Sequence, residues 1–196
     1  MKHSKQTWLF LFGLFALAAF YRVVQMKYLP EFPNFSPLMA IAFCAGLLLP
    51  WRLALTAGFL PLLLSDLALN YLYEVPLLGG GEVLRWLCFG VALAVGVWLG
   101  RREWKLSSVV GATFGNAVFF YLISNSAAWL VSPAYAKTSS GWAQALTVGA
   151  PGFPPTWMFF RNSLVADFAF TALILAVYFV AVRRAASVDT SRAAVG

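Results

Sequence analysis

The stretch Gly79–Gly100, GGGEVLRWLCFGVALAVGVWLG, sets the character of this chain. Its central run, Val83–Leu99, is apolar enough and nearly long enough to cross the hydrocarbon core of a bilayer as one helix. Three glycines precede the run and predict a hinge in the loop before the helix. Arg85 and Cys88 are three residues apart, so a helix places them on one face, one turn from each other. The stretch therefore predicts a membrane helix with a cation and a thiol near its start.

Similar apolar runs fill most of the chain, which is 61% hydrophobic and 11% charged over 196 residues. A soluble domain of this size carries about a quarter charged residues. We therefore expect an all-α integral membrane protein, a single membrane domain spanning residues 1–196 with six transmembrane helices. The first run follows a basic start and also resembles a signal peptide, but it is long enough to be retained as a span. The expected spans are residues 7–24, 38–49, 53–73, 83–99, 106–131 and 157–182, and the small polar tail 187–196 is expected to be disordered.

The basic residues predict the orientation of these spans. Six spans leave both termini on one side, where nine of the 14 Lys and Arg residues lie, against two in the opposite loops and three within spans. The positive-inside rule then places both termini in the cytoplasm. The net charge of +7 does not indicate nucleic-acid binding, because the basic residues are spread between apolar runs and form no stripe.

Polar residues within the spans gather in their outer halves. Each charged group at such depth costs about 2.5–3.5 kcal/mol and needs a partner or water. Together they favour a polar cavity open to the outside, although structural ion pairing of the arginines with the aspartates, or snorkelling to headgroups, is an alternative. The residues are Arg22, Asp66, Asn70, Arg85, Asn125, Arg161, Asn162 and Asp167.

Two loops on the outer side carry aromatic residues that are suited to cover such a cavity. Three prolines exclude a helix from Met26–Pro37, and the long loop Ser132–Thr156 contains four prolines. The candidate covering residues are Tyr28, Phe32, Phe35, Tyr135 and Trp142. Glycine pairs at GxxxG spacing, Gly96 with Gly100 and Gly111 with Gly115, predict close helix packing within the monomer, with packing against a partner as the alternative.

The reactive residues are few. His3 is the single histidine and the two cysteines lie in separate apolar runs, so no zinc site or Ser-His-Asp triad is available. Cys44 is interpreted as a small hydrophobe in the second span. Cys88 has Arg85 one turn away, which favours its thiolate. It can be an inert packing residue or an axial ligand to a metal already held in a macrocycle, and the residues alone leave both readings open.

Four short motifs carry a family resemblance. They are Pro33-Asn34-Phe35-Ser36-Pro37, Leu64-Ser65-Asp66, Ser124-Asn125 with Trp129, and Phe159-Phe160-Arg161-Asn162-Ser163-Leu164-Val165-Ala166-Asp167. Over roughly Leu9 to Val182 the chain resembles the S-components of energy-coupling-factor (ECF) vitamin transporters. The length and the cysteine in the fourth span resemble, more narrowly, the BtuM-type cobalamin uptake proteins.

The resemblance implies a six-helix, multi-pass protein of the bacterial inner membrane that binds a vitamin near its outer face. It implies that Cys88 ligates the cobalt of cobalamin, the transported ligand, and that its thiolate removes cyanide from cyanocobalamin. No intrinsic cofactor is implied. The lipid bilayer is the environment, and the protein works with an ECF energising module or alone.

The leading hypothesis is therefore a transport protein, not an enzyme, that captures cobalamin. The expected binding residues are Cys88, Arg85, Tyr28, Phe32, Phe35, Asp66, Asn125, Tyr135, Trp142, Arg161 and Asn162. One alternative is an S-component for another vitamin or small metabolite, with Cys88 inert. Others are a membrane-embedded enzyme that uses Asp66 and Asp167 as acid and base, and a structural subunit that binds no small molecule.

Overall fold

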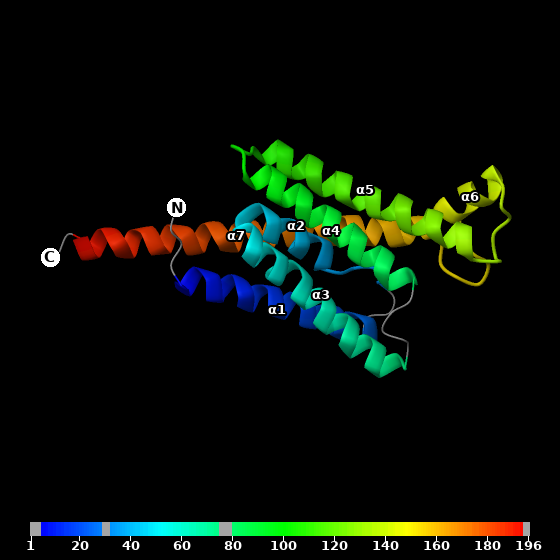
Figure 1. Ribbon diagram of the computed structural model, residues 1–196, viewed down its shortest axis with the longest axis horizontal. Coiled ribbons are helices and arrows are strands. Elements are labelled where there is room, and N and C mark those ends of the chain that lie inside the picture. Colours follow the sequence, from blue (N-terminus) through cyan, green and yellow to red (C-terminus); the bar gives the residue numbers. More distant parts are fainter. Residues whose placement is uncertain (1–4, 29–31, 75–79, 194–196) are drawn as a thin grey trace.

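The short helix α2 (Leu38–Leu48) lies at the centre of a helical bundle (Figure 1). The computed structural model describes residues 5–28, 32–74 and 80–193. In α2, the residues from Leu38 to Leu47 are all buried, as expected for a helix that is apolar on every side. It packs most extensively on α4 and also contacts α3 and α7. The other helices are α1 (Lys5–Tyr28), α3 (Trp51–Tyr73), α4 (Gly80–Gly100), α5 (Leu106–Val131), α6 (Ser139–Leu146) and α7 (Thr156–Ala193).

Glycines allow α2 and α4 to approach each other closely. A Cβ atom on Gly96 would collide with the carbonyl oxygen of Phe43, and one on Gly46 with that of Leu93. The predicted close packing at Gly96 and Gly100 is thus confirmed, with α2 as the partner. The same prediction is wrong for α5, because no described atom lies within 4 Å of a Cβ built on Gly111 or Gly115.

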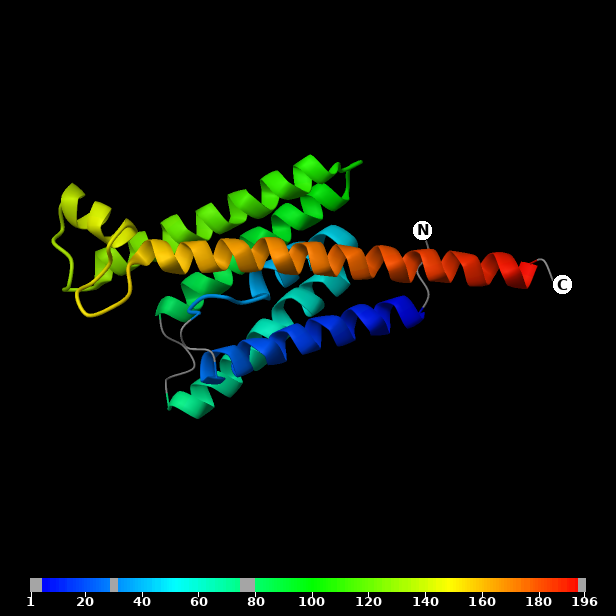
Figure 2. The same cartoon turned by 180° about the vertical axis from the view of Figure 1, so that it is seen from behind.

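The six longer elements alternate in direction along the bundle (Figures 1 and 2). The start of α1, the end of α7 and the α2–α3 and α4–α5 turns lie at one end, and α6 lies at the other. Among the described residues, α3, α4, α5 and α7 each contain a segment long and apolar enough to cross a membrane. The protein is therefore all-α, with the long apolar helices typical of a membrane protein.

Several boundaries differ from those expected. Gly80 and Gly81 begin α4 instead of forming a hinge, and Gly79 lies outside the described residues. Helix α1 continues to Tyr28, because proline forbids helix only from about the residue before Pro30. Helix α7 extends to Ala193 through the tail that was expected to be disordered, since adding residues to an existing helix costs little.

Helix α6 was not expected in the long loop. Its N-terminus is capped by Thr138, whose hydroxyl oxygen accepts a hydrogen bond from the Gly141 amide at 3.2 Å. This cap satisfies a backbone donor that the helix itself leaves free. Eight residues are too few for an apolar pattern to be read from the sequence, and the prolines around α6 conceal it further.

Candidate functional site

Two adjoining cavities lie among α4, α5, α7 and the segment 32–37 that precedes α2. Their volumes are about 420 and 270 Å³. Both are lined by Asn34, Phe120 and Ser163, so these residues form the wall between them. The larger cavity falls within the range of about 300–1,000 Å³ that is typical of small-molecule sites.

The segment 32–37 runs as irregular backbone into the bundle, where Pro37 is fully buried. Its carbonyl groups are satisfied by side chains of two helices. Gln25 of α1 donates from Nε2 to the Phe32 oxygen at 2.5 Å, and Asn162 of α7 donates from Nδ2 to the Pro33 oxygen at 3.1 Å. Non-helical backbone at this depth is tolerated where it is buried in protein or lines a cavity. The segment then turns through Asn34, which has φ +60°.

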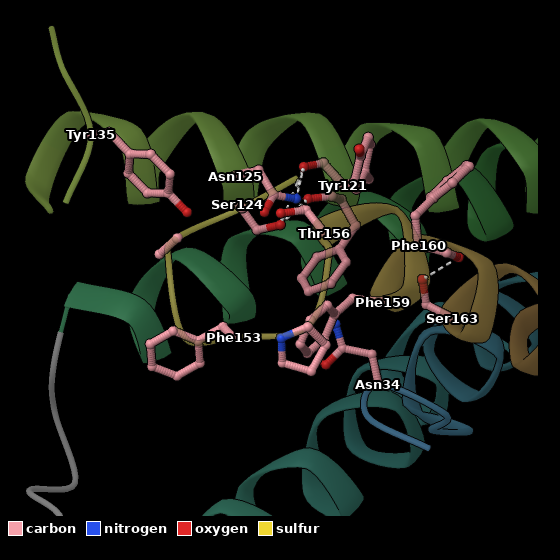
Figure 3. A pocket seen from close by; sticks show the side chains of 14 residues that line it. Asn34, Tyr121, Ser124, Asn125, Tyr135, Phe153, Thr156, Phe159, Phe160 and Ser163 are labelled. Carbon is pink, nitrogen blue, oxygen red and sulfur yellow. Dashed lines mark hydrogen bonds between the residues drawn. The ribbon is translucent and has the colours of Figure 1, made fainter. Parts of the chain in front are cut away.

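The smaller cavity combines polar and aromatic side chains (Figure 3). Ser124 and Asn125 of α5 face it, and each donates a hydrogen bond at 2.7 Å to a carbonyl of its own helix. The Asn125 Oδ1 atom makes no hydrogen bond to a described residue and can therefore accept one from a ligand. The aromatic wall consists of Phe120, Tyr121, Tyr135, Phe153, Phe159 and Phe160.

The loop that follows α5 is attached over this cavity by side-chain hydrogen bonds. Trp129 donates from Nε1 to the Ala136 oxygen at 2.8 Å, and Tyr121 donates to the Leu146 oxygen. Trp142 of α6 donates from Nε1 to Ser126 Oγ at 2.8 Å. The loop therefore forms an ordered cover, and both Tyr135 and Phe153 reach the cavity from it (Figure 3).

The larger cavity carries two groups of opposite charge. Arg85 of α4 pairs through Nη2 with Asp66 Oδ2 at 3.0 Å, and Trp86 Nε1 donates to the same oxygen at 2.8 Å. The Nε atom of Arg85 is buried and has no described partner. Asp167 of α7 is 4% exposed and makes no hydrogen bond or ion pair with any residue that the structure describes. The cavity thus holds a cation and a carboxylate with unused bonding capacity.

The structure brings only some of the sequence-predicted binding residues to these cavities. Arg85 lines the larger cavity, and Asn125 and Tyr135 line the smaller one. Asp66 and Asn162 lie behind the walls, where Asp66 holds Arg85 and Asn162 holds Pro33.

The other predicted residues lie elsewhere. Phe35 packs between Tyr21 and Phe170, with ring centroids 6.5 and 5.9 Å away. Cys88 is 2% exposed and belongs to the apolar core of the bundle. The residues around Cys88 in α4 are mostly apolar, so the sequence alone cannot show whether its side chain faces a neighbouring helix or a cavity. The remaining four are exposed and line neither cavity: Tyr28, Phe32, Trp142 and Arg161.

Sequence reasoning missed several lining residues, chiefly Gln25, Asn34, Phe120 and Ser163. Ser163 had a usable signal, because it lies four residues before Asp167 and therefore on the same face of α7. Asn34 stands between two prolines in a short motif, but its position on the shared wall depends on the path of the segment into the bundle.

In the described parts of the chain, no three His, Cys, Asp or Glu side chains lie close enough together to hold a metal ion. Cys44 and Cys88 are both free thiols, and both are buried. Asp66 lines neither cavity, so the two aspartates of the enzyme hypothesis do not face a common space.

Comparison with known proteins gives a single assignment. No curated protein and no solved structure matches the chain. A family model matches residues 2–189, which is nearly the whole sequence, and that model describes a family of unknown function, DUF6580. The chain is a member of the DUF6580 family.

Proposed function

We propose that this protein is a membrane-embedded binding protein that captures a small organic solute for uptake, in the manner of an S-component. The observation that carries this proposal is the pair of adjoining cavities within a mainly apolar bundle. Polar groups line them, aromatic rings wall them and an ordered loop covers one of them. Buried polar groups in a membrane protein are costly and usually serve a ligand or a transport path.

The proposed topology has six spans, α1 to α5 and α7, with α2 too short to cross a bilayer by itself. Eight Lys and Arg residues of the described chain belong to the bundle end that carries the start of α1 and the end of α7, which the positive-inside rule assigns to the cytoplasm. The α6 end and the smaller cavity would then face outward, in a bacterial inner membrane. This orientation suits capture from outside.

Native mass spectrometry of the purified full-length protein tests the binding function. We expect a bound small molecule, and we expect Ser163→Leu to lose it, because Ser163 lines both cavities. The matched control is Ser107→Leu, which makes the same change at an exposed position on α5. A protein that carries no small molecule, in any preparation from cells, would contradict the proposal.

Labelling of single introduced cysteines tests the orientation. Ser140 on α6 and Ser107 on α5 are both exposed, and the two native cysteines are too buried to give a large background. A membrane-impermeant maleimide added to intact cells should label Ser140→Cys and spare Ser107→Cys. The reverse pattern would invert the proposed topology.

A narrower candidate is cobalamin, with Cys88 as the cobalt ligand. It is favoured by Arg85 and Phe89, which line the larger cavity on either side of Cys88 in α4. The thiol itself is buried in the apolar core, so ligation requires the core around it to open. Titration with cobalamin should then shift the corrin absorption, Cys88→Ala should abolish the shift and Cys44→Ala should preserve it. An unshifted spectrum with the unmodified protein refutes cobalt ligation and leaves another vitamin or metabolite as the solute.

A further inference from the structure

We propose that the solute of the larger cavity is a small organic cation, whose charged nitrogen pairs with Asp167 and whose apolar body lies against Phe89 and Phe120. This inference rests on the proposed binding function and adds the chemical class of the ligand. It follows from the charged side chains on the cavity wall, of which Arg85 has an ion-pair partner and Asp167 has none among the described residues.

The unpaired carboxylate is the first step. Asp167 lies eleven residues into α7, about 16 Å along its axis at 1.5 Å per residue. It is 4% exposed, lines the cavity and has no hydrogen-bond or ion-pair partner among the described residues. A carboxyl group buried without a partner is disfavoured as the anion and holds its proton, whereas a cation that comes to it stabilises the carboxylate.

The cation that lines the same cavity does not meet this need. Arg85 lines the same cavity from α4, but its guanidinium group is held by Asp66 at 3.0 Å and lies 3.9 Å from Glu82. No ion pair joins Arg85 to Asp167 in the described structure, and no Cα atoms of α4 and α7 lie within 8 Å of each other. The cavity therefore separates the two groups.

The balance of charge at the cavity then favours a cationic ligand. Among the described side chains, Asp66 and Arg85 pair with each other, so Asp167 is left as the carboxyl group on the cavity wall that can give up its proton and pair with an added cation. An ammonium group at Asp167 would form a charge-assisted hydrogen bond in a medium of low dielectric constant. The free Nε of Arg85 would remain to donate a hydrogen bond to an acceptor elsewhere on the ligand.

The rest of the wall suits an apolar or aromatic body. Leu38 and Met39 at the start of α2 line the cavity together with Phe89 and Phe120, whose ring centroids are 6.4 Å apart. The electron-rich faces of aromatic rings also attract cations. A cation that carries a ring or a short hydrocarbon chain thus has a partner for each of its parts.

Three probes of equal shape test the inference: 4-methylbenzylamine as the cation, 4-methylbenzyl alcohol as the neutral molecule and 4-methylbenzoate as the anion. Binding to the full-length protein, freed of any carried molecule, is measured by calorimetry. Because hydrogen bonds to charged groups are worth about 1.5–3 kcal/mol, the amine should bind roughly tenfold or more tightly than the alcohol, and the anion weakest.

Two variants locate the effect. Asp167→Asn keeps the size of the side chain and should bring the amine to the affinity of the alcohol. Glu103→Gln removes one negative charge from an exposed loop and should leave the preference for the amine unchanged. The comparison among the three probes on the unmodified protein does not depend on either variant, so a folding defect in Asp167→Asn leaves the test intact.

The outcomes separate this inference from the broader proposal. Equal binding of the three probes, a preference for the anion, or a preference that survives Asp167→Asn would refute a cation site and leave solute binding in place. Failure of all three probes, in a protein that carries a neutral or anionic molecule from cells, also refutes the cation site alone. A protein that carries no molecule and binds no probe refutes both.

Discussion

Replacing Asn162 by alanine should loosen the segment 32–37 that walls both cavities. Asn162 is 5% exposed, and its Nδ2 atom donates to the Pro33 oxygen at 3.1 Å across 129 residues of sequence. The described contacts give that oxygen no other donor, so truncation leaves a half-buried carbonyl unsatisfied.

The expected loss can be estimated from the same geometry. Leaving a buried polar group without its partner costs about 1–3 kcal/mol in soluble proteins. Hydrogen bonds within membrane bundles average about 0.6 kcal/mol with a maximum near 1.7, because the reference state also finds partners. We therefore expect about 1–2 kcal/mol. At about 2–4 °C per kcal/mol for a chain of this size, the melting temperature should fall by about 2–8 °C.

The two buried cysteines supply the assay. Cys44 and Cys88 are 0% and 2% exposed, so a maleimide that fluoresces on reaction reports their exposure as the protein unfolds in detergent. The control is Asn125→Ala, which deletes the same amide from a bond at 2.7 Å to Tyr121 of its own helix. That bond joins no separate elements, and the change should cost less than about 0.5 kcal/mol. Equal melting of Asn162→Ala and the unmodified protein would refute the anchoring role of Asn162.

Three further predictions use the same melting assay. Arg85→Met should destabilise the protein by about 3 kcal/mol, which is the low end for a broken buried ion pair because the Arg85 side chain is a quarter exposed. Adding Asp66→Leu should recover part of this loss, and no recovery would mean that Arg85 and Asp66 are not energetically coupled. Gly96→Ala should lower the melting temperature, because a Cβ there meets the backbone of α2, whereas Gly111→Ala has open space and should not; similar melting of both would contradict the close α2–α4 contact. Glycine tolerates the φ of +60° at position 34, so Asn34→Gly should leave the melting temperature unchanged. Because it removes a side chain that lines both cavities, the affinity for the ligand should fall, and an unchanged affinity would exclude Asn34 from the site.

Much of the candidate site depends on contacts that no local pattern encodes. The sequence places Arg85 and Asp66 in neighbouring spans at similar depth, and the structure pairs them. The sequence equally offers Cys88 on the face of Arg85, but the side chain of Cys88 is buried in the apolar core while Arg85 reaches the cavity. Residues three apart on a helix differ by about 60° in direction, which is enough to separate a core position from a cavity wall.

The sequence by itself determined that the chain is an all-helical protein with long apolar helices, because hydrophobic runs act locally and need no knowledge of neighbours. The glycine pairs do need it, since the pair on α4 packs closely and the pair on α5 does not. The sequence also predicted that polar groups would gather in one part of the bundle. Only the tertiary structure decided which of them face a cavity. Asn34 and Ser163 come from segments 129 residues apart and line the same walls. Their meeting depends on the path of an irregular segment into the bundle and on the side-chain hydrogen bonds that hold it there.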